Sequence, residues 1–244
     1  MTYVVIGAPS GVGRYVAESL AAAGEDLLLV SRDKRDSTAQ AADLFYRYNI
    51  RAKAVALDLG EHRPEFLDFD RALESLGNVN GIVITVGGGL ENDSIGGLEA
   101  CADAIMTVNF LSVCLCIEHV LPRIRHGREP VIVGIGSIAA CRGRSRNVIY
   151  SAAKRALLSY FESLRHAVDG WGVRVQFYQL GYVDTNLAFG QRLLLPAASP
   201  RSVGRKIANN LKHGSGVFFY PRFWYVVCLL LRALPWPVFR RMKL

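Results

Sequence analysis

Short apolar runs alternate with helical patterns along the whole chain. We expect strands at 3–6, 27–30, 52–57, 81–85, 131–135, 173–178 and 217–220. Helical spacing of apolar residues predicts helices at 64–76, 102–125, 149–167 and 200–212. Apolar strands that alternate with helices are typical of a parallel sheet covered on both faces. The pattern therefore predicts an α/β fold, a Rossmann-type doubly wound parallel sheet of about seven strands.

The first expected helix begins at Gly11 and is stopped by Gly24. Its apolar face is formed by Val12, Val16, Leu20 and Ala23. In a doubly wound sheet, ligands bind beyond the carboxyl ends of the strands. The residues that directly follow each strand are therefore the candidates for a binding or catalytic site.

The composition is that of an ordinary globular protein. Of 244 residues, 51% are hydrophobic and 20% are charged, which suffices for one full core. No linker rich in Pro, Ser or Gly divides the chain. We expect a single catalytic domain over 1–221, followed by an apolar, aromatic- and arginine-rich extension at 222–244.

Charge and cysteine usage narrow the partners and the compartment. The net charge is +8, but basic residues cluster only at 142–146 and 240–243, so we expect no nucleic-acid partner. The five cysteines contain no C-x-x-C pair, which argues against a metal site or a disulfide framework and favours the cytoplasm. The N-terminus enters a strand at once, without the features of a signal peptide.

A glycine-rich turn follows the first strand, formed by Gly7, Ser10, Gly11, Val12 and Gly13. Glycines allow a tight turn and a close approach of the backbone to a pyrophosphate, which the helix N-terminus stabilises. The turn is a candidate dinucleotide site, although a plain strand-to-helix turn would show the same glycines.

The end of the second strand reports on the type of nicotinamide cofactor. An acidic residue there binds the ribose hydroxyls of NAD, whereas an arginine binds the 2′-phosphate of NADP. The sequence reads Ser31-Arg32-Asp33, which offers Arg32 for a bidentate phosphate contact. Asp33 complicates this interpretation, and we expect Arg35 to be a solvated residue at a helix start. We favour NADP(H), with Arg32 as the phosphate ligand.

A serine, a tyrosine and a lysine form the strongest chemical signal. Ser137 ends a strand, and Tyr150 and Lys154 lie four residues apart on one face of a helix. Asn109 lies in the long helix before that strand. These residues, in this order and on these elements, together with the G-x-x-x-G-x-G turn, resemble the short-chain dehydrogenase/reductase family over essentially the whole chain.

The resemblance implies an NADP-dependent oxidoreductase that transfers a hydride to a ketone. Tyr150 would donate the proton, Ser137 would hydrogen-bond the developing alkoxide, and Lys154 would bind the nicotinamide ribose. Asn109 would hold the water of a proton relay. A free phenol has a pKa of about 10, and we expect the Lys154 ammonium and the nicotinamide cation to lower it.

Other segments match the cofactor site of the family with departures. Asp58 and Leu59 resemble the pair beside the adenine, although a surface turn would place an Asp there equally often. Val86 and Gly87 lie where the family carries Asn-Asn-Ala-Gly, and this chain reads Ile-Thr-Val-Gly. After the sixth strand, where leucine replaces the usual proline, the resemblance assigns Gly181, Val183 and Thr185.

The extension is rich in Trp, Leu, Pro and Arg. Its uninterrupted apolar stretch, 223–231, is much shorter than the ~20 residues needed to span a bilayer. Aromatic residues and terminal cations suggest a segment that lies in a membrane interface, with the protein peripheral on the inner face. The side chains that would then enter the membrane are Trp224, Leu229, Leu230 and Trp236. The alternative is that the extension packs on its own domain or on a sister subunit of a homo-oligomer.

A narrower resemblance links Arg142, Arg144, Arg146 and the extension to the keto-reductase of polyprenyl-phosphate-ribose epimerisation. That enzyme type reduces a keto-sugar on a lipid phosphate, which arginines near Tyr150 would meet; otherwise they belong to a solvated loop. We expect an NADPH-dependent reductase of a bulky amphiphilic ketone, such as a lipid-linked keto-sugar. The alternatives are a reductase of 3-ketoacyl or other lipophilic ketones, a non-catalytic NADP(H)-binding regulator, and a membrane-associated scaffold with a vestigial site.

Overall fold

The computed structural model describes residues 1–89, 93–185 and 195–242. Within these residues, one sheet is formed by seven strands: β1 (Thr2–Ile6), β2 (Asp26–Ser31), β3 (Ala52–Ala56), β4 (Val79–Ile84), β5 (Val131–Ser137), β6 (Arg174–Leu180) and β7 (Gly216–Tyr220). All neighbouring strands are parallel, in the order β3-β2-β1-β4-β5-β6-β7. This confirms the predicted doubly wound α/β fold.

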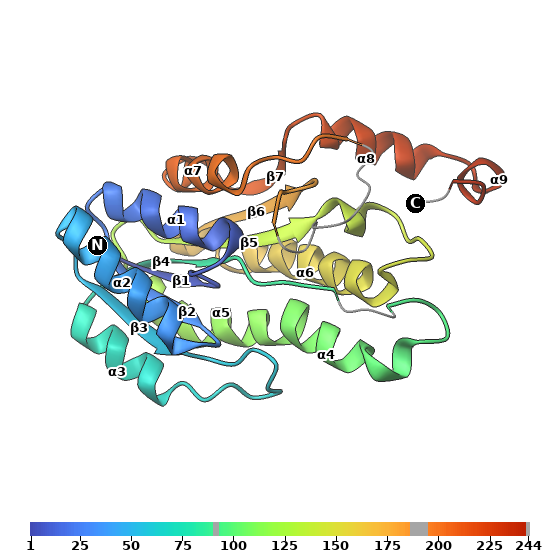
Figure 1. The fold of residues 1–244 in the computed structure, drawn as a ribbon. Helices are drawn as coiled ribbons and strands as arrows, with labels where there is room; N and C mark the ends of the chain where they lie inside the picture. Colours follow the sequence, from blue (N-terminus) through green and yellow to red (C-terminus); the bar gives the residue numbers. More distant parts are fainter. Residues whose placement is uncertain (90–92, 186–194, 243–244) are drawn as a thin grey trace.

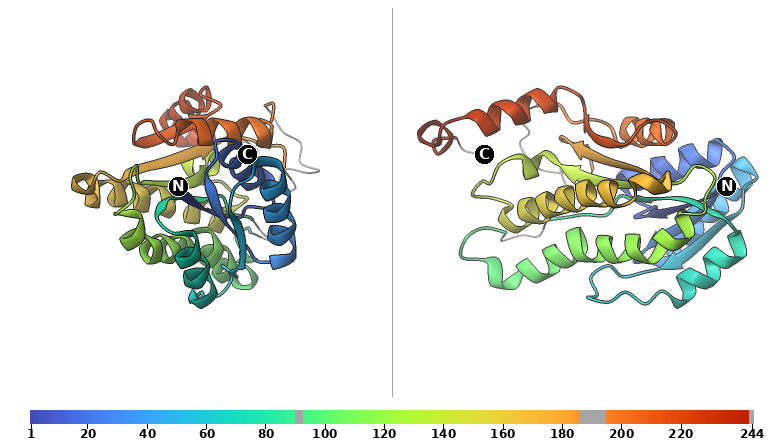
Figure 2. Two further views of the ribbon diagram at one scale, coloured as in Figure 1. Left: turned by 90° about the vertical axis from the view of Figure 1, so that its left-hand side faces the viewer. Right: turned by 180° about the vertical axis from the view of Figure 1, so that it is seen from behind.

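Helices cover both faces of the sheet (Figures 1 and 2). The helices of the first face are α1 (Gly11–Ala22), α2 (Lys34–Tyr48) and α7 (Pro200–Asn210). Those of the second are α3 (Leu67–Leu76), α4 (Ala102–Met106), α5 (Ser112–Ile124) and α6 (Val148–Ala167). Two clusters of buried apolar side chains result, one under each helical layer.

Two details of the helices differ from the expected pattern. In α1, Val12, Val16 and Leu20 are buried as expected, but Ala23 lies beyond the last turn and is exposed. For α2, the sequence-based expectation placed only a helix start near Arg35 and gave no bounds. The buried residues of α2 are Ser37, Gln40, Ala41 and Leu44. Because half of this face is polar, the apolar spacing that reveals the other helices does not stand out.

The helical segment Ala102–Ile124 is long and apolar enough to cross a membrane by length and composition alone. In the fold, however, Val113, Ile117 and Val120 are buried in the core between this segment and the sheet. Its apolar composition is therefore accounted for by the domain core.

The carboxyl ends of the central strands meet at one edge of the sheet. Ile84 at the end of β4 pairs with Ile6 of β1 and with Gly134 of β5. Ser137 pairs with Leu180 at the ends of β5 and β6. The loops that follow these strands therefore face one another.

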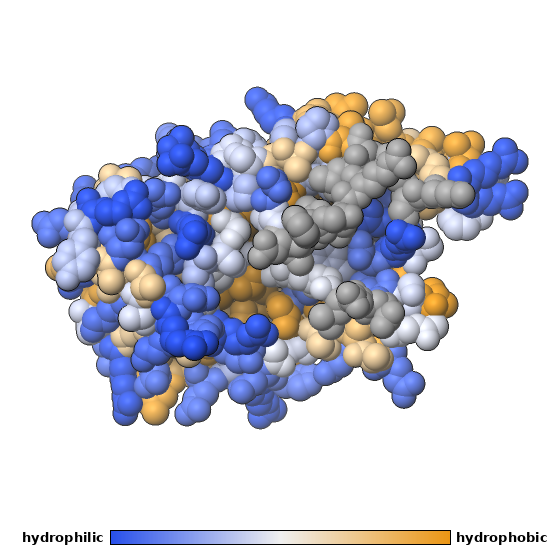
Figure 3. Space-filling view, viewed as in Figure 1, coloured by the Kyte–Doolittle hydropathy of each residue, from blue (hydrophilic) through white to orange (hydrophobic). Residues whose placement is uncertain are grey.

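The C-terminal helices α8 (Trp224–Ala233) and α9 (Trp236–Phe239) extend along the outside of the domain beyond β7 (Figures 1 and 2). Trp224, Cys228 and Phe239 are buried against the domain. The expectation that Trp224 would be available to a membrane was therefore wrong. The opposite side forms an exposed apolar patch (Figure 3), here called the α8–α9 patch, of Tyr225, Val226, Leu229, Leu230, Trp236 and Val238.

Candidate active site

Three segments bring the candidate catalytic side chains together. β5 ends at Ser137, α6 carries Tyr150 and Lys154, and a π-helical turn, Thr107–Leu111, carries Asn109. The Ser137 side chain lies near enough to the Tyr150 hydroxyl to lower its pKa. Lys154 Nζ lies 5.9 Å from the centre of the Tyr150 ring.

Gly87, after β4, is the point where Lys154 and Asn109 come close. A Cβ at this position would lie 2.6 Å from Lys154 Nζ and 2.9 Å from Asn109 Oδ1. Real side chains do not tolerate such contacts, so the approach of these two groups requires a glycine. The segment after β4 thus lies beside the candidate catalytic residues.

Lys154 is almost completely buried, with an exposed fraction of 2%. Its Nζ donates hydrogen bonds to the carbonyl oxygens of Val86 (3.3 Å) and Ile135 (3.2 Å). Burial disfavours the ammonium and lowers the pKa of Lys154 to about 8. Lys154 is therefore a group that exchanges its proton not far from neutral pH.

Burial has the opposite consequence for Tyr150, because it disfavours the phenolate and raises the pKa. The Ser137 side chain and the positive charge of Arg144 pull this pKa down, but burial outweighs them. We expected a lowered pKa at Tyr150. As far as the side chains of the protein decide this pKa, the expectation was wrong. It considered the effect of nearby charges and not the free-energy cost of burying a phenolate.

Asn109 is fully buried, and its amide holds the loop after β4. Its Oδ1 accepts a hydrogen bond from the Gly88 N–H (3.1 Å), and its Nδ2 donates to the carbonyl oxygens of Gly88 (2.8 Å) and Ile105 (2.9 Å). The π-helical turn is a wider, locally irregular helix of the kind that recurs at functional sites. Its role in holding a water stays a prediction.

The glycine-rich turn has the close backbone approach that its sequence indicated. Gly7 has a φ of +82°, and a Cβ at Gly13 would collide with the Gly7 carbonyl oxygen. Ser10 precedes α1 and makes no capping hydrogen bond through its side chain. From the other side of the cleft, Thr185 Cγ2 would lie 3.4 Å from a Cβ at Gly11. The turn after β1 and the segment after β6 therefore border the same space.

At the end of β2, the charged side chains of Arg32 and Asp33 are neighbours in the sequence but have different surroundings in the structure. Asp33 caps α2 by accepting a hydrogen bond from the Arg35 N–H, and Arg35 also binds it through an ion pair of 2.6 Å. These contacts lower the pKa of Asp33 to about 2. Arg32 is exposed, and within the described residues it makes no ion pair. Asp33 is thus paired with Arg35, which leaves Arg32 facing solvent.

In the segment after β3, Asp58 lies in a surface turn and Leu59 packs in the core. Asp58 is exposed, and its Oδ1 accepts a hydrogen bond from the Gly60 N–H (2.7 Å). Leu59 is buried in the core, and its carbonyl oxygen accepts from the Ser112 hydroxyl (2.7 Å). Asp58 therefore has the geometry of a surface turn at the cofactor edge of the sheet.

Thr85 is a structural residue of the site that sequence reasoning missed. Its hydroxyl donates to the Ile6 carbonyl oxygen (2.9 Å) and lies 2.8 Å from the position of a Cβ at Gly7. It therefore ties the end of β4 to the glycine-rich turn. The only signal in the sequence was a hydroxyl directly after a strand, where the family carries asparagine.

The segment after β6 packs against the C-terminal extension. The Gly181 N–H donates to the Tyr220 carbonyl oxygen (3.0 Å), and a Cβ at Gly181 would collide with the Trp224 indole. Val183 forms an isolated bridge with Ala198. Through Trp224, α8 becomes part of the wall beside the candidate site.

A buried carboxylate, Asp93, holds the start of the helix that carries Tyr150. Its two oxygens accept hydrogen bonds from the N–H groups of Ile149 (2.7 Å) and Tyr150 (2.9 Å). A carboxylate at this end of a helix also interacts favourably with the helix dipole. The sequence could not reveal this contact, because Asp93 lies more than fifty residues before the helix that it caps.

The three arginines of the loop before α6 do not act as one cluster. Arg142 donates to the carbonyl oxygens of Leu231 and Leu234 at the end of α8, and it stacks over the Phe239 ring at 3.9 Å. The hypothesis that Arg142 meets a phosphate beside Tyr150 was therefore wrong, because its guanidinium is engaged with the extension. Arg146 is exposed.

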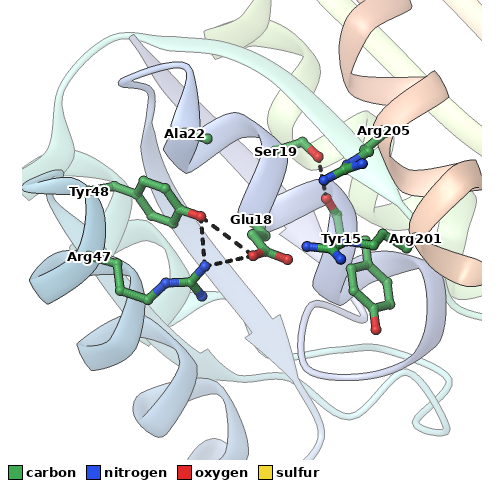
Figure 4. A pocket seen from close by; sticks show the side chains of 8 residues that line it. All are labelled: Tyr15, Glu18, Ser19, Ala22, Arg47, Tyr48, Arg201 and Arg205. Carbon is green, nitrogen blue, oxygen red and sulfur yellow. Dashed lines mark hydrogen bonds and ion pairs between the residues drawn. The ribbon is translucent and has the colours of Figure 1, made fainter.

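A pocket of about 200 Å³ lies elsewhere on the surface, between α1, α2 and α7. Figure 4 shows Glu18 at its centre, bound to Arg47 at 2.7 Å and facing the Tyr48 hydroxyl. Glu18, Arg47 and Tyr48 thus satisfy one another. None of the expected site residues lines this pocket.

The model of the short chain dehydrogenase family matches residues 1–192. The chain is 31% identical over 191 residues to the very-long-chain 3-oxoacyl-CoA reductase of Anas platyrhynchos, a match that covers 76% of this chain and 60% of that protein. It is 29% identical over 190 residues to an uncharacterized oxidoreductase of Staphylococcus saprophyticus, covering 76% of this chain and 79% of the other.

Among solved structures, a short-chain dehydrogenase from Sphingobium yanoikuyae in complex with NADPH superposes with a TM-score of 0.78. The two chains are 23% identical, and the match covers 99% of this chain and 96% of the other. This likeness shows a shared fold.

The pKa of Lys154 predicts that one lysine titrates apart from the others. With 13C-labelled lysine side chains, one Cε resonance should titrate with a midpoint near pH 8, because burial disfavours its ammonium, whereas exposed lysines titrate near pH ~10.4. NMR spectra between pH 6 and pH 11 would measure this. The resonance should disappear in Lys154→Arg. A protein in which every lysine titrates like an exposed one would contradict the burial effect.

Proposed function

We propose that this chain, which belongs to the short-chain dehydrogenase family, is an NADP-dependent oxidoreductase that reduces a ketone to an alcohol. The observation that carries the proposal is the convergence of Ser137, Tyr150 and Lys154 at the carboxyl edge of the sheet, beside the glycine-rich turn. A tyrosine and a lysine at this spacing occur often by chance. Their meeting with the serine and the dinucleotide turn at one edge is specific.

The residues of this edge fit a dinucleotide. Gly7 and Gly13 permit the tight turn, because a Cβ at either position would collide with Thr85 or with the Gly7 carbonyl oxygen. The N-terminal N–H groups of α1, which this turn leads into, suit a pyrophosphate. Arg32 would bind the 2′-phosphate of NADP(H), because its guanidinium is exposed and Asp33 is paired with Arg35. Other proposed contacts come from Ser10, Gly11, Val12, Asp58, Leu59, Val86, Gly87, Gly181, Val183 and Thr185. When bound, the cofactor supplies the hydride.

Tyr150 is proposed as the acid. Its raised pKa keeps the phenol protonated at neutral pH, and this is the form that donates a proton to a ketone oxygen. Ser137, which lies close to Tyr150, would stabilise the same oxygen as negative charge develops on it. Lys154 would bind the ribose and return a proton to Tyr150 through a water held near Asn109.

We propose a bulky amphiphilic ketone as the substrate, with a lipid-linked keto-sugar as the first candidate. The α8–α9 patch supports an amphiphilic ligand, and it lies on the side of the extension opposite Trp224, which packs against Gly181. A 3-ketoacyl substrate is the second candidate, favoured by the likeness to the very-long-chain 3-oxoacyl-CoA reductase of Anas platyrhynchos. A non-catalytic NADP(H)-binding regulator needs the glycine-rich turn but has no need of the catalytic side chains.

We further propose that α8 and α9 attach the protein to a membrane surface from the cytoplasmic side without crossing it. Leu230 and Trp236 are 63% and 64% exposed, and Arg240 and Arg241 are exposed next to them. Anionic headgroups attract such cations while the apolar side chains enter the interface. The alternative occupant of the patch is a second copy of the chain in a homo-oligomer.

Tyr150→Phe tests the proposed reaction. Removing the acidic hydroxyl should slow NADPH-dependent ketone reduction by about 10²–10⁴-fold, because a positioned general acid contributes that much. The affinity for NADPH should be unchanged, since only the hydroxyl is lost. The rate is measured from NADPH oxidation at 340 nm with a panel of ketones. The affinity for NADPH is measured by fluorescence titration. Tyr160→Phe, on the same helix, is the control and should retain full activity. A Tyr150→Phe enzyme that keeps more than a tenth of the rate would exclude the role of Tyr150.

Arg32→Ala tests the choice of cofactor. NADPH should bind about 10- to 150-fold more weakly, which corresponds to the loss of a charge-assisted contact of about 1.5–3 kcal/mol. NADH should bind as before, because it lacks the 2′-phosphate, and titration with both cofactors measures the difference. The affinity of Arg32→Lys for NADPH should lie between that of the wild-type protein and that of Arg32→Ala. Lysine keeps the positive charge but lacks the planar guanidinium that binds a phosphate through two N–H groups. Equal weakening for both cofactors would show that Arg32 does not bind the phosphate.

The membrane proposal predicts binding to vesicles that contain phosphatidylglycerol. Co-sedimentation should decrease with salt without vanishing, because salt screens the arginines and leaves the apolar contribution. Replacing Leu229, Leu230 and Trp236 by serine should abolish the salt-resistant part. Phe45→Ser/Tyr46→Ser, on the exposed side of α2, is the control. A wild-type protein that ignores these vesicles at low salt would assign the patch to a subunit interface instead.

A further inference from the structure

The loop between the 3₁₀ turn Ile138–Cys141 and α6 carries an arginine at every second position. Arg142 is engaged by the end of α8 and by Phe239, and Arg146 is exposed to solvent. Arg144 is partly buried like Arg142, but it makes none of the contacts with the C-terminal extension that hold Arg142. The same loop leads directly into the helix turn that carries Tyr150.

The Arg144 Nε–H is buried and has no hydrogen-bond partner among the residues that the structure describes. No ion pair of Arg144 occurs in that part of the chain either. A buried guanidinium N–H without an acceptor costs free energy, and native proteins rarely leave one unmatched without a functional reason. The observation points to an acceptor that these described residues do not supply.

The electrostatics of Tyr150 locate this charge beside the reacting group. Arg144 is the charged side chain that lowers the pKa of Tyr150, because its positive charge favours the phenolate. The other groups around Tyr150 are Ser137 from β5, Lys154 on the same helix, 5.9 Å from the ring centre, and Asp93, which accepts from the Tyr150 backbone N–H. Arg144 therefore lies close enough to Tyr150 for its charge to act on the hydroxyl.

We propose that Arg144 is a specificity-determining residue that binds an oxyanion of the ketone substrate, a phosphate or a carboxylate, next to the carbonyl that Tyr150 protonates. The proposal rests on the proposed ketone reductase activity. A planar guanidinium with an unmatched N–H suits an oxyanion, since Arg forms short, charge-assisted hydrogen bonds to both groups.

Binding of such an anion also affects the acid. Without it, the positive charge of Arg144 favours loss of the Tyr150 proton. An oxyanion beside Arg144 offsets that charge, so the phenol holds its proton more firmly once the substrate is in place. Binding of the anion therefore leaves Tyr150 in the protonated form, which is the form that donates.

The test compares matched ketones that differ in charge. Rates are measured with 3-oxodecanoate, its methyl ester and 2-oxodecyl phosphate, and the two anions distinguish carboxylate from phosphate. Arg144→Gln should lower kcat/KM about 10- to 150-fold for the preferred anion, as expected for one lost charge-assisted contact, and leave the ester nearly unchanged. Arg146→Gln, two residues along the same loop, should affect none of the three. Arg144→Lys should restore part of the rate for the anion.

Equal losses for the anion and the ester would overturn the proposal, because Arg144 would then only support the loop. Unchanged rates for all three would also overturn it and would leave the ketone reductase intact. If wild-type protein reduces none of the ketones, the proposed function fails for this substrate class, and calorimetry decides about Arg144 separately. Binding of 2-oxodecyl phosphate or 3-oxodecanoate to the NADP⁺-saturated protein should then weaken in Arg144→Gln. No binding, or binding that Arg144→Gln and Arg144→Lys both leave unchanged, would overturn the proposal.

Discussion

The buried ammonium of Lys154 is the interaction on which the rest of the site depends. A charge that is 98% removed from solvent would be costly without acceptors, and the carbonyl oxygens of Val86 and Ile135 supply them at the ends of β4 and β5. This contact is possible only because Gly87 has no side chain. It fixes α6 against the sheet edge and so places Tyr150, one helical turn earlier, next to Ser137.

Burial sets opposite pKa shifts for the two titratable groups. The same dry environment lowers the pKa of Lys154 to about 8 and raises that of Tyr150. The lysine can then give up its proton near neutral pH, whereas the tyrosine keeps its proton until a ketone oxygen takes it. Tyr150 is thus suited to donate a proton, and Lys154 is suited to return a proton to Tyr150. This division of roles follows from one physical cause, the poor solvation of charge in the cleft.

The C-terminal extension belongs to the architecture of the site as well as to the surface. Trp224 packs against Gly181 in the segment after β6, and Arg142 donates hydrogen bonds to the end of α8. One side of the extension is therefore anchored to the two loops that border the substrate side, while the α8–α9 patch on the other side is open. An amphiphilic ketone with an anionic group would meet Arg144 at the reacting end and apolar surface beyond it. This arrangement connects the proposed substrate with the proposed membrane contact.

The sequence by itself determined the parallel sheet, the glycine-rich turn and the pairing of Tyr150 with Lys154, because each depends on spacing within one element or one turn. It also singled out Arg32 as the candidate ligand of the 2′-phosphate, from its place directly after the second strand. Only the tertiary structure decided the roles of Asp93, Thr85 and Trp224, the engagement of Arg142 and the direction of the Tyr150 pKa. These depend on contacts between residues far apart in the chain and on burial, and neither has a signature at short range along the sequence.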